Sequence, residues 1–220
     1  MVHLFRRAAV RRRSALAAGV VVLGAAAGAV AFVPPGGPRS LRSFEPDRMA
    51  ELEVDMWRAY YRKEKVRLFG LLVTMLHEQN RYSWAKASRA AFHLARAAAR
   101  FGDARSEYER ALPDLERAYT IARDWNGAGF DPGEVARAEL AWWVARRQPG
   151  MSSADVGGVI ADEYALLYEV PRARVAGAAA LRAEAAALRD RGGDKADWES
   201  VSRLLLESYR GLHAAVNTPP

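Results

Sequence analysis

The sequence predicts an all-α protein in which an N-terminal single membrane-spanning or signal helix precedes a compact bundle of about seven to eight helices. Three observations predict this class. A long uncharged apolar run follows a cluster of arginines close to the N-terminus. Beyond a Pro/Gly-rich spacer, apolar residues recur every three or four positions, which is the period of a helix. No stretch alternates between apolar and polar residues for long enough to indicate a strand.

The first element consists of a basic region, residues 1–14, and an apolar core, residues 15–33. As a helix, the core would rise about 28 Å, close to the roughly 30 Å of the hydrocarbon interior of a bilayer. Five arginines lie before the core, and positive charge at that end of a span stays in the cytoplasm. We therefore expect residues 15–33 to contact the lipid bilayer of the bacterial cytoplasmic membrane, as a single pass with the N-terminus inside and the domain outside.

The same segment also has the features of a cleaved signal peptide. Small residues precede Phe32, and the run from Arg12 to Leu16 is similar to a twin-arginine export signal. In this alternative the protein would be secreted after cleavage near Ala31. The apolar core is long for a signal peptide, which favours an anchor, but the sequence leaves both fates open.

The net charge of +7 comes from the N-terminal part of the chain. Seven of the 33 basic residues precede Glu45, whereas all 26 acidic residues lie at or after it, so the helical body is electrically neutral. A neutral body gives no reason to expect nucleic acid as a partner, because nucleic-acid-binding domains carry clustered positive charge. The chain has no cysteine, which excludes disulfides, thiolate catalysis and cysteine-based zinc sites.

A Pro/Gly-rich linker, residues 34–44, separates the apolar core from the helical body. The segment from Pro34 to Pro38 cannot continue a helix and is expected to be a flexible, extended spacer. We expect one all-helical extracytoplasmic domain over residues 45–216 and a short tail over residues 217–220. The apolar periodicity predicts helices at residues 46–62, 65–79, 83–101, 106–125, 132–147, 153–169, 171–191 and 196–215.

Local signals mark where these helices begin and end. Asp131 and Ser152 each place a side-chain acceptor at a helix start, with an acid three residues later. Gly127 and Gly193 are typical of helix ends, because glycine adopts the left-handed conformation found there. Pro113 should kink or divide the helix predicted at residues 106–125.

The helix at residues 65–79 is apolar on nearly all sides, which is typical of a helix at the centre of a bundle. The alternative is a helix on the membrane surface, because Lys63, Lys65 and Arg67 flank its start. We expect the central position.

Three glutamates, Glu53, Glu139 and Glu163, have apolar neighbours at the helical positions around them. Each should therefore project from an apolar helix face. A carboxylate buried there without a partner is strongly unfavourable, so each of the three is expected to need a cation or a hydrogen-bond donor.

The helix at residues 83–101 offers such cations, because Arg89, His93 and Arg96 recur at helical spacing and share one of its faces. The simpler interpretation is that these cations pair with the inward acids or face water. The alternative is a polar pocket inside the bundle, in which they and the three glutamates bind a metal, a substrate or an anionic headgroup.

No motif supports a specific chemistry. The histidines lack the glutamate three residues earlier that a di-iron bundle uses, and zinc-protease, nucleophile, phosphate-loop and dinucleotide motifs do not occur. We therefore expect no metal, no cofactor and no catalytic residue. No motif ties the chain to a named family.

The favoured hypothesis is a membrane-tethered extracytoplasmic domain that is not an enzyme and binds or scaffolds an unknown protein partner. The alternative is an exported enzyme, or a ligand- or metal-binding protein, that uses the inward glutamates and the Arg/His face. The two hypotheses differ in geometry, because the second requires the three acids to converge beside an accessible cavity.

Overall fold

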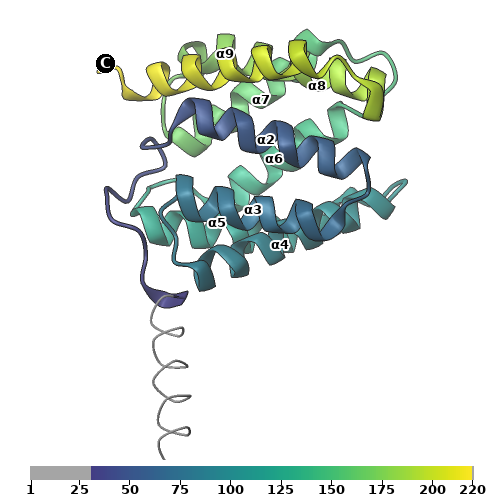
Figure 1. Cartoon of the computed structure of the whole chain (residues 1–220). Helices are drawn as coiled ribbons and strands as arrows, with labels where there is room; N and C mark the ends of the chain where they lie inside the picture. The colour runs from purple at the N-terminus through teal and green to yellow at the C-terminus, as the bar shows by residue number, and fades with distance from the viewer. Residues whose placement is uncertain (1–30, 220) are drawn as a thin grey trace, which may run out of the picture.

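The computed structural model describes residues 31–219 (Figure 1). In this range the chain folds into eight α-helices, α2 to α9, and two short 3₁₀ helices without a strand, which confirms the all-α class. The helices are α2 (Pro46–Tyr61), α3 (Lys65–Gln79), α4 (Trp84–Asp103), η1 (Tyr108–Ala111), α5 (Leu112–Asn126), α6 (Pro132–Ala145), α7 (Ser153–Tyr168), α8 (Arg172–Gly192), η2 (Gly193–Lys195) and α9 (Trp198–Asn217).

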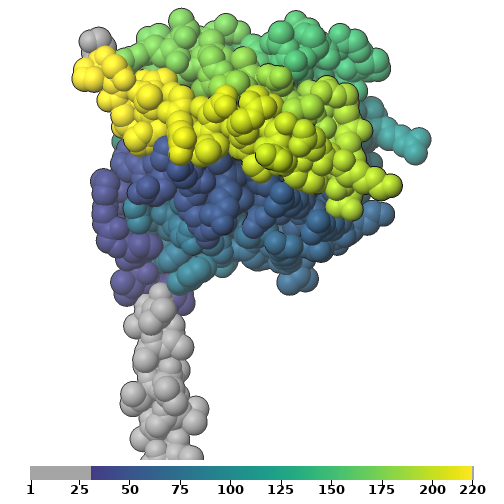
Figure 2. All heavy atoms as spheres, turned by 45° about the horizontal axis from the view of Figure 1, so that its top comes forward, coloured from purple at the N-terminus to yellow at the C-terminus, as the bar shows by residue number. Residues whose placement is uncertain are grey.

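The helices pack as a closed ring. Each helix packs mainly on the helices before and after it in the chain, and α9 returns to pack on α2. In Figure 1, α7, α8 and α9 lie on one side of the ring, and α3, α4 and α5 lie on the other. The space-filling view shows α2 and α9 meeting along a continuous seam (Figure 2). A ring of this kind turns one side of each helix toward a shared interior.

Small residues let α7, α8 and α9 pack closely. Ala178 and Ala179 of α8 are buried, and Ser208 of α9 donates its hydroxyl to the carbonyl oxygen of Ala178 at 2.7 Å. A Cβ added at Gly157 of α7 would lie 3.0 Å from the Cα of Ala180, so α7 and α8 meet almost backbone to backbone. These three helices therefore form the most tightly packed part of the ring.

The expected start and stop signals are confirmed where the structure describes them. The side chain of Asp131 accepts a hydrogen bond from the first turn of α6, and Ser152 and Asp155 form a capping box at α7. Gly127 follows α5 in the left-handed conformation, with φ of 63°. Pro113 lies in the first turn of α5, which the 3₁₀ helix η1 precedes, so the helix predicted at residues 106–125 is divided as expected.

The expected central position of the apolar helix at residues 65–79 is wrong. Val66 of α3 is 89% exposed, Phe69 is also exposed, and the buried residues of this helix are Val73 and Gln79. The reason is topological, since α3 packs on α2 and α4 at its two sides and a ring has no helix at its centre. The apolar composition of α3 therefore places hydrophobic side chains on the outer surface.

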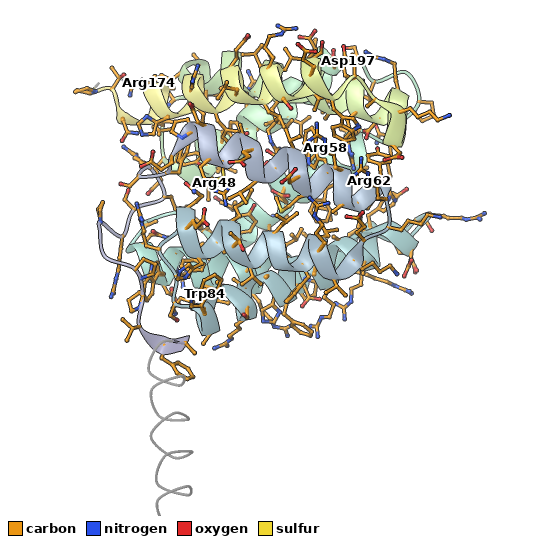
Figure 3. All side chains as sticks on the ribbon, viewed as in Figure 1. Arg48, Arg58, Arg62, Trp84, Arg174 and Asp197 are labelled. Carbon is orange, nitrogen blue, oxygen red and sulfur yellow. The ribbon has the colours of Figure 1, made fainter. Side chains whose placement is uncertain are left out.

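Ion pairs bridge the outer seams of the ring. Arg48 of α2 donates to Glu78 of α3 at 2.8 Å, and Arg210 of α9 donates to Asp47 of α2 at 2.7 Å. Figure 3 shows the charged side chains that surround the ring, with Arg48 on the side of α2 that faces α3. These pairs are exposed to water, so each contributes little free energy and mainly fixes the register of neighbouring helices.

The second half of the linker, residues 39–44, is packed against the body. The guanidinium of Arg42 donates to the carbonyl oxygens of Tyr168 at 2.6 Å and Val216 at 3.2 Å. Phe44 is 3% exposed, and Leu41 packs against the main core. These contacts fix residues 39–44 to the ends of α7 and α9.

The expected basic region and most of the apolar core, residues 15–33, lie outside the described residues. From residue 31 to residue 219, no helix is both long enough and apolar enough to cross a membrane.

Candidate functional site

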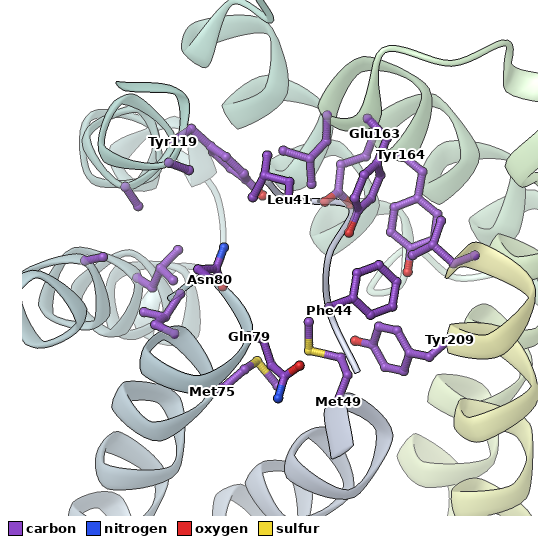
Figure 4. Close-up of a pocket in the computed structure, with 18 of the residues that line it drawn as sticks. Leu41, Phe44, Met49, Met75, Gln79, Asn80, Tyr119, Glu163, Tyr164 and Tyr209 are labelled. Atoms are coloured by element: carbon purple, nitrogen blue, oxygen red, sulfur yellow. Dashed lines mark hydrogen bonds between the residues drawn. The ribbon is translucent and has the colours of Figure 1, made fainter. Parts of the chain in front are cut away.

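A cavity of about 220 Å³ lies in the interior of the ring (Figure 4). Residues of α3, α4 and α5 line one side, and residues of α7, α8 and α9 line the other. Leu41 and Phe44 of the linker also contribute to the wall. Most of the wall is apolar, and its polar groups come from side chains such as Gln79, Glu163 and Arg182. The cavity is the feature around which the candidate residues can be placed.

Glu53 projects from α2 into the interior, where it is 4% exposed. Arg182 of α8 donates from Nη2 to Oε1 of Glu53 at 2.6 Å, and the hydroxyl of Tyr209 of α9 donates to Oε2. The guanidinium of Arg182 also lies 4.9 Å from the ring centroid of Trp142 of α6. One cation and one phenol therefore satisfy both oxygens of Glu53, and the group links four helices.

The pKa shifts follow from this geometry. Burial would lower the pKa of Arg182, but the Glu53 carboxylate and other nearby groups outweigh it and raise the pKa well above its usual value. Burial and the charge of Glu53 raise the pKa of Tyr209 well above its usual value. Glu53 and Arg182 thus form an ion pair, with Tyr209 as a neutral donor.

The other two inward glutamates meet at Tyr119 of α5. Its hydroxyl lies 2.8 Å from Oε2 of Glu139 of α6 and 3.5 Å from Oε1 of Glu163 of α7. A phenol has one proton to donate, and the shorter contact assigns it to Glu139. The contact between the same hydroxyl and Oε1 of Glu163 is the longer and weaker of the two.

The protonation of Glu163 has a clear physical cause. The side chain is 4% exposed, and its burial raises the pKa well above the usual value. The neighbouring Glu139 raises the pKa further, because two carboxylates so close together disfavour a second negative charge. Burial and the neighbouring carboxyl therefore both favour the protonated form of Glu163.

One oxygen of Glu163 has no partner. Its Oε2 is buried and receives no hydrogen bond from any residue that the structure describes, and the same holds for Nε of Arg182. Both side chains line the cavity, and Figure 4 shows the Glu163 carboxyl at its wall, beside Tyr164. Buried polar atoms are nearly always satisfied, so an unpaired acceptor and an unpaired donor on one cavity indicate a place for a guest molecule.

The predicted cations of α4 lie at a different site. His93 and Arg96 contact Asp114 of α5, which is 0% exposed. Nη2 of Arg96 donates to Oδ1 at 2.6 Å, its Nε donates to Oδ2 at 2.7 Å, and Nδ1 of His93 lies 3.1 Å from Oδ1. Arg100 approaches Oδ2 of the same carboxylate at 2.8 Å. Arg89 lies on the exposed side of α4.

Asp114 is accordingly held in its charged form. Burial would raise its pKa, but the hydrogen bonds from Arg96 and His93 outweigh burial and lower the pKa to about 2. None of Asp114, His93 and Arg96 lines the cavity. The cluster joins α4 to α5 and has a closed set of partners, which is the pattern of a structural ion network.

The six residues singled out by sequence therefore divide into two groups. Glu139 and Glu163 meet at Tyr119, and Glu53 pairs with Arg182. Glu163 is the one of the three acids that lines the cavity, and Arg89, His93 and Arg96 do not line it. Sequence reasoning missed Arg182, the cation that faces the acids. It occupies the same stripe of α8 as buried alanines, and that position was the available signal.

Sequence reasoning also missed Asp114, the counter-ion of the α4 stripe. It follows Pro113 in the first turn of a helix, where acidic residues are common for local reasons. The aligned cations of α4 were the available signal, because an Arg/His stripe that is partly buried requires a carboxylate nearby.

The arrangement can hold a proton and a polar guest, and no group of three or more His, Asp or Glu residues within residues 31–219 is placed to hold a metal ion. Comparisons with models of protein families, with curated proteins and with solved structures find no match to this chain. The site itself therefore carries the functional argument.

Proposed function

We propose that this protein is a membrane-tethered, extracytoplasmic helical domain that binds a small organic molecule in the interior of its ring. The observation that carries the binding proposal is a cavity whose wall includes two polar side chains, Glu163 and Arg182, each with a buried polar atom that no described residue pairs. The unpaired Oε2 of Glu163 lies in its wall. The arginine-rich, apolar leader supports the location outside the cytoplasmic membrane.

Native mass spectrometry of the full-length protein, purified from its own membranes, tests the binding proposal. The expected result is a small molecule that stays bound to the folded protein and is released on unfolding. Ala118→Leu narrows the cavity and should reduce the bound fraction, because Ala118 is buried in its wall. Ala99→Leu is the matched control, since Ala99 is exposed on α4. Equal occupancy in both variants would contradict the proposal.

Cell fractionation and N-terminal sequencing test the tether. The expected result is recovery in the membrane fraction with the leader intact. A soluble protein that begins at Phe32 would contradict the tether and support secretion, while it would leave the ligand proposal standing.

A second candidate function is the binding or scaffolding of a protein partner. It is favoured by the 89% exposed Val66 and the exposed Phe69 on α3, which place apolar surface in contact with water. Crosslinking in native membranes tests it. A partner crosslinked in the original protein should be lost in Val66→Ser, and capture that is unchanged in this variant would oppose a role for α3.

A further inference from the structure

The interior of the ring has an excess of negative groups. Glu53, Glu139 and Glu163 contribute three carboxyls, while Arg182 is the guanidinium among them. Arg182 pairs with Glu53 and also acts on Glu163 through its charge, so the three carboxyls share this one guanidinium. A proton on Glu163 reduces this excess of negative charge.

The unpaired Oε2 of Glu163 shows where a positive group could replace that proton. It is an acceptor in the cavity wall, on a side chain that is 4% exposed. A guest with N–H donors would satisfy it, whereas the oxygens of an anionic guest would place further acceptors against an acceptor.

Aromatic side chains surround the same space. Phe44, Tyr119, Tyr164, Tyr168 and Tyr209 all line the cavity. The faces of aromatic rings carry partial negative charge and attract cations, especially where water is excluded. Apolar groups complete the wall, so a cation with an apolar body matches its chemistry better than a small inorganic ion does.

The size of the cavity limits the guest. A dry cavity of about 150 Å³ holds a benzene molecule, so 220 Å³ corresponds to roughly nine non-hydrogen atoms. This is the size of a single small molecule and excludes a peptide or a lipid with long chains.

We propose that the cavity binds a small organic cation, a protonated amine on a compact apolar or aromatic body, with its ammonium against Oε2 of Glu163. This inference rests on the proposed ligand-binding function and names the chemical class of the ligand. Binding is coupled to proton release. The ammonium keeps its own proton, Glu163 gives its proton to water, and the new carboxylate pairs with the ammonium.

The ionisable groups around Glu163 come from every helix that packs near it. They are Glu139 of α6, Tyr119 of α5, Tyr164 and Tyr168 of α7 and Arg182 of α8, with Glu53 of α2 and Tyr209 of α9 on the far side of Arg182. The tyrosines stay neutral, because burial raises the pKa of Tyr119, Tyr164 and Tyr209 well above the usual value. Glu163 is therefore the group in this set that changes charge when the ammonium enters.

Calorimetric titration of the full-length protein in lipid nanodiscs tests the class, with empty nanodiscs as the blank. The probes are 2-phenylethylamine, 2-phenylethanol and phenylacetate, which share a ring and differ in charge. The amine should bind at least tenfold more tightly than the alcohol, and phenylacetate should not bind. Measured in buffers of different ionisation enthalpy, the amine should release one proton per molecule bound, and the alcohol none.

Glu163→Gln provides the variant test, with the exposed Glu184→Gln on α8 as the matched control. Glu163→Gln should reduce the amine affinity at least tenfold and abolish proton release, with a smaller loss of alcohol affinity, while Glu184→Gln should change nothing. If Glu163→Gln does not fold, proton release by the original protein still decides the question. Alcohol or phenylacetate binding as tight as that of the amine would overturn the cation proposal and leave the site intact. Binding of none of the probes, together with no co-purified molecule, would overturn the proposed function as well.

Discussion

Asp114 and Glu163 are two buried carboxyls in one ring of helices, and their surroundings shift their pKa values in opposite directions. Asp114 has the guanidinium groups of Arg96 and Arg100 within 2.8 Å and the imidazole of His93 at 3.1 Å, so its pKa falls to about 2. Burial raises the pKa of Glu163, and the acid that it faces raises the pKa further. Burial raises the pKa in both cases, and the neighbours decide the outcome.

The difference separates a structural site from a candidate binding site. Both oxygens of Asp114 are occupied by side chains of α4, and nothing remains for a guest. One oxygen of Glu163 is buried in a cavity wall with no partner among the described residues. A charged group with a complete set of partners stabilises the fold, while one with an incomplete set is available for binding.

The largest expected effect comes from removing the cation of the cavity. Arg182→Met should lower the free energy of unfolding by about 3–5 kcal/mol, because Glu53 would remain buried without a counter-charge. Urea unfolding followed by circular dichroism measures this loss. Replacing both partners, as Arg182→Met with Glu53→Leu, should recover most of it. If Arg182→Met alone were as stable as the original protein, the ion pair of Arg182 and Glu53 would not be buried as described.

Asp114→Asn should have the next largest effect. The loss should be about 2 kcal/mol, below that of a fully buried pair, because Arg96 and Arg100 are partly exposed and water screens them. The dependence of the free energy of unfolding on pH should also change at acidic pH. The folded-state pKa of Asp114 is lowered, so its stabilisation is complete above the unfolded value of 3.8 and is lost as pH falls through about 2. Urea unfolding between pH 2 and pH 5 should show this loss in the original protein and not in Asp114→Asn.

Glu163 should have the opposite pH dependence. Its folded-state pKa is raised, so its contribution to stability is complete below 4.5 and decreases as pH rises toward the folded value. The slope from this one group should be at most about 1.4 kcal/mol per pH unit. Glu163→Gln keeps a neutral donor beside Glu139, and should therefore be within about 1 kcal/mol of the original at neutral pH and lack this slope. An unchanged slope in the variant would assign the pH dependence to another group.

The smallest expected effect is at the edge of the Asp114 cluster. Arg117 lies 3.6 Å from Oδ1 of Asp114 and its side chain is 56% exposed. Arg117→Ala should therefore change the free energy of unfolding by less than about 0.5 kcal/mol. A loss as large as that of Asp114→Asn would show that the cluster acts as one network rather than through Arg96 and His93.

The sequence predicts the local parts of this structure well, because local signals determine them. The cap at Ser152, the stop at Gly127 and the break at Pro113 all depend on a few neighbouring residues and occur as expected. The closure of the ring depends on contacts between α2 and α9, which lie at opposite ends of the helical body. The apolar periodicity of a sequence contains no information about such a pairing between distant helices. The predicted position of α3 was wrong for that reason.

The candidate site was predicted in part. Glu53, Glu139 and Glu163 stand out because an acid among large apolar residues is unusual. Arg182 does not, because its neighbours are alanines, which are found on buried and exposed faces alike, and because arginine is abundant in this chain. Which cation pairs with which acid depends on the three-dimensional arrangement. His93 and Arg96, the cations that the sequence suggested as partners, contact Asp114 instead.

The wall that the linker gives to the cavity has a practical consequence for where the functional domain begins. The helix boundaries suggest a domain that starts at Glu45, just before α2. A protein shortened to that residue would lose Leu41 and Phe44 from the cavity wall, and with them Arg42, which holds the segment against α7 and α9. The unit that folds and the unit that binds therefore have different first residues. Ligand studies require the chain from residue 39 onward.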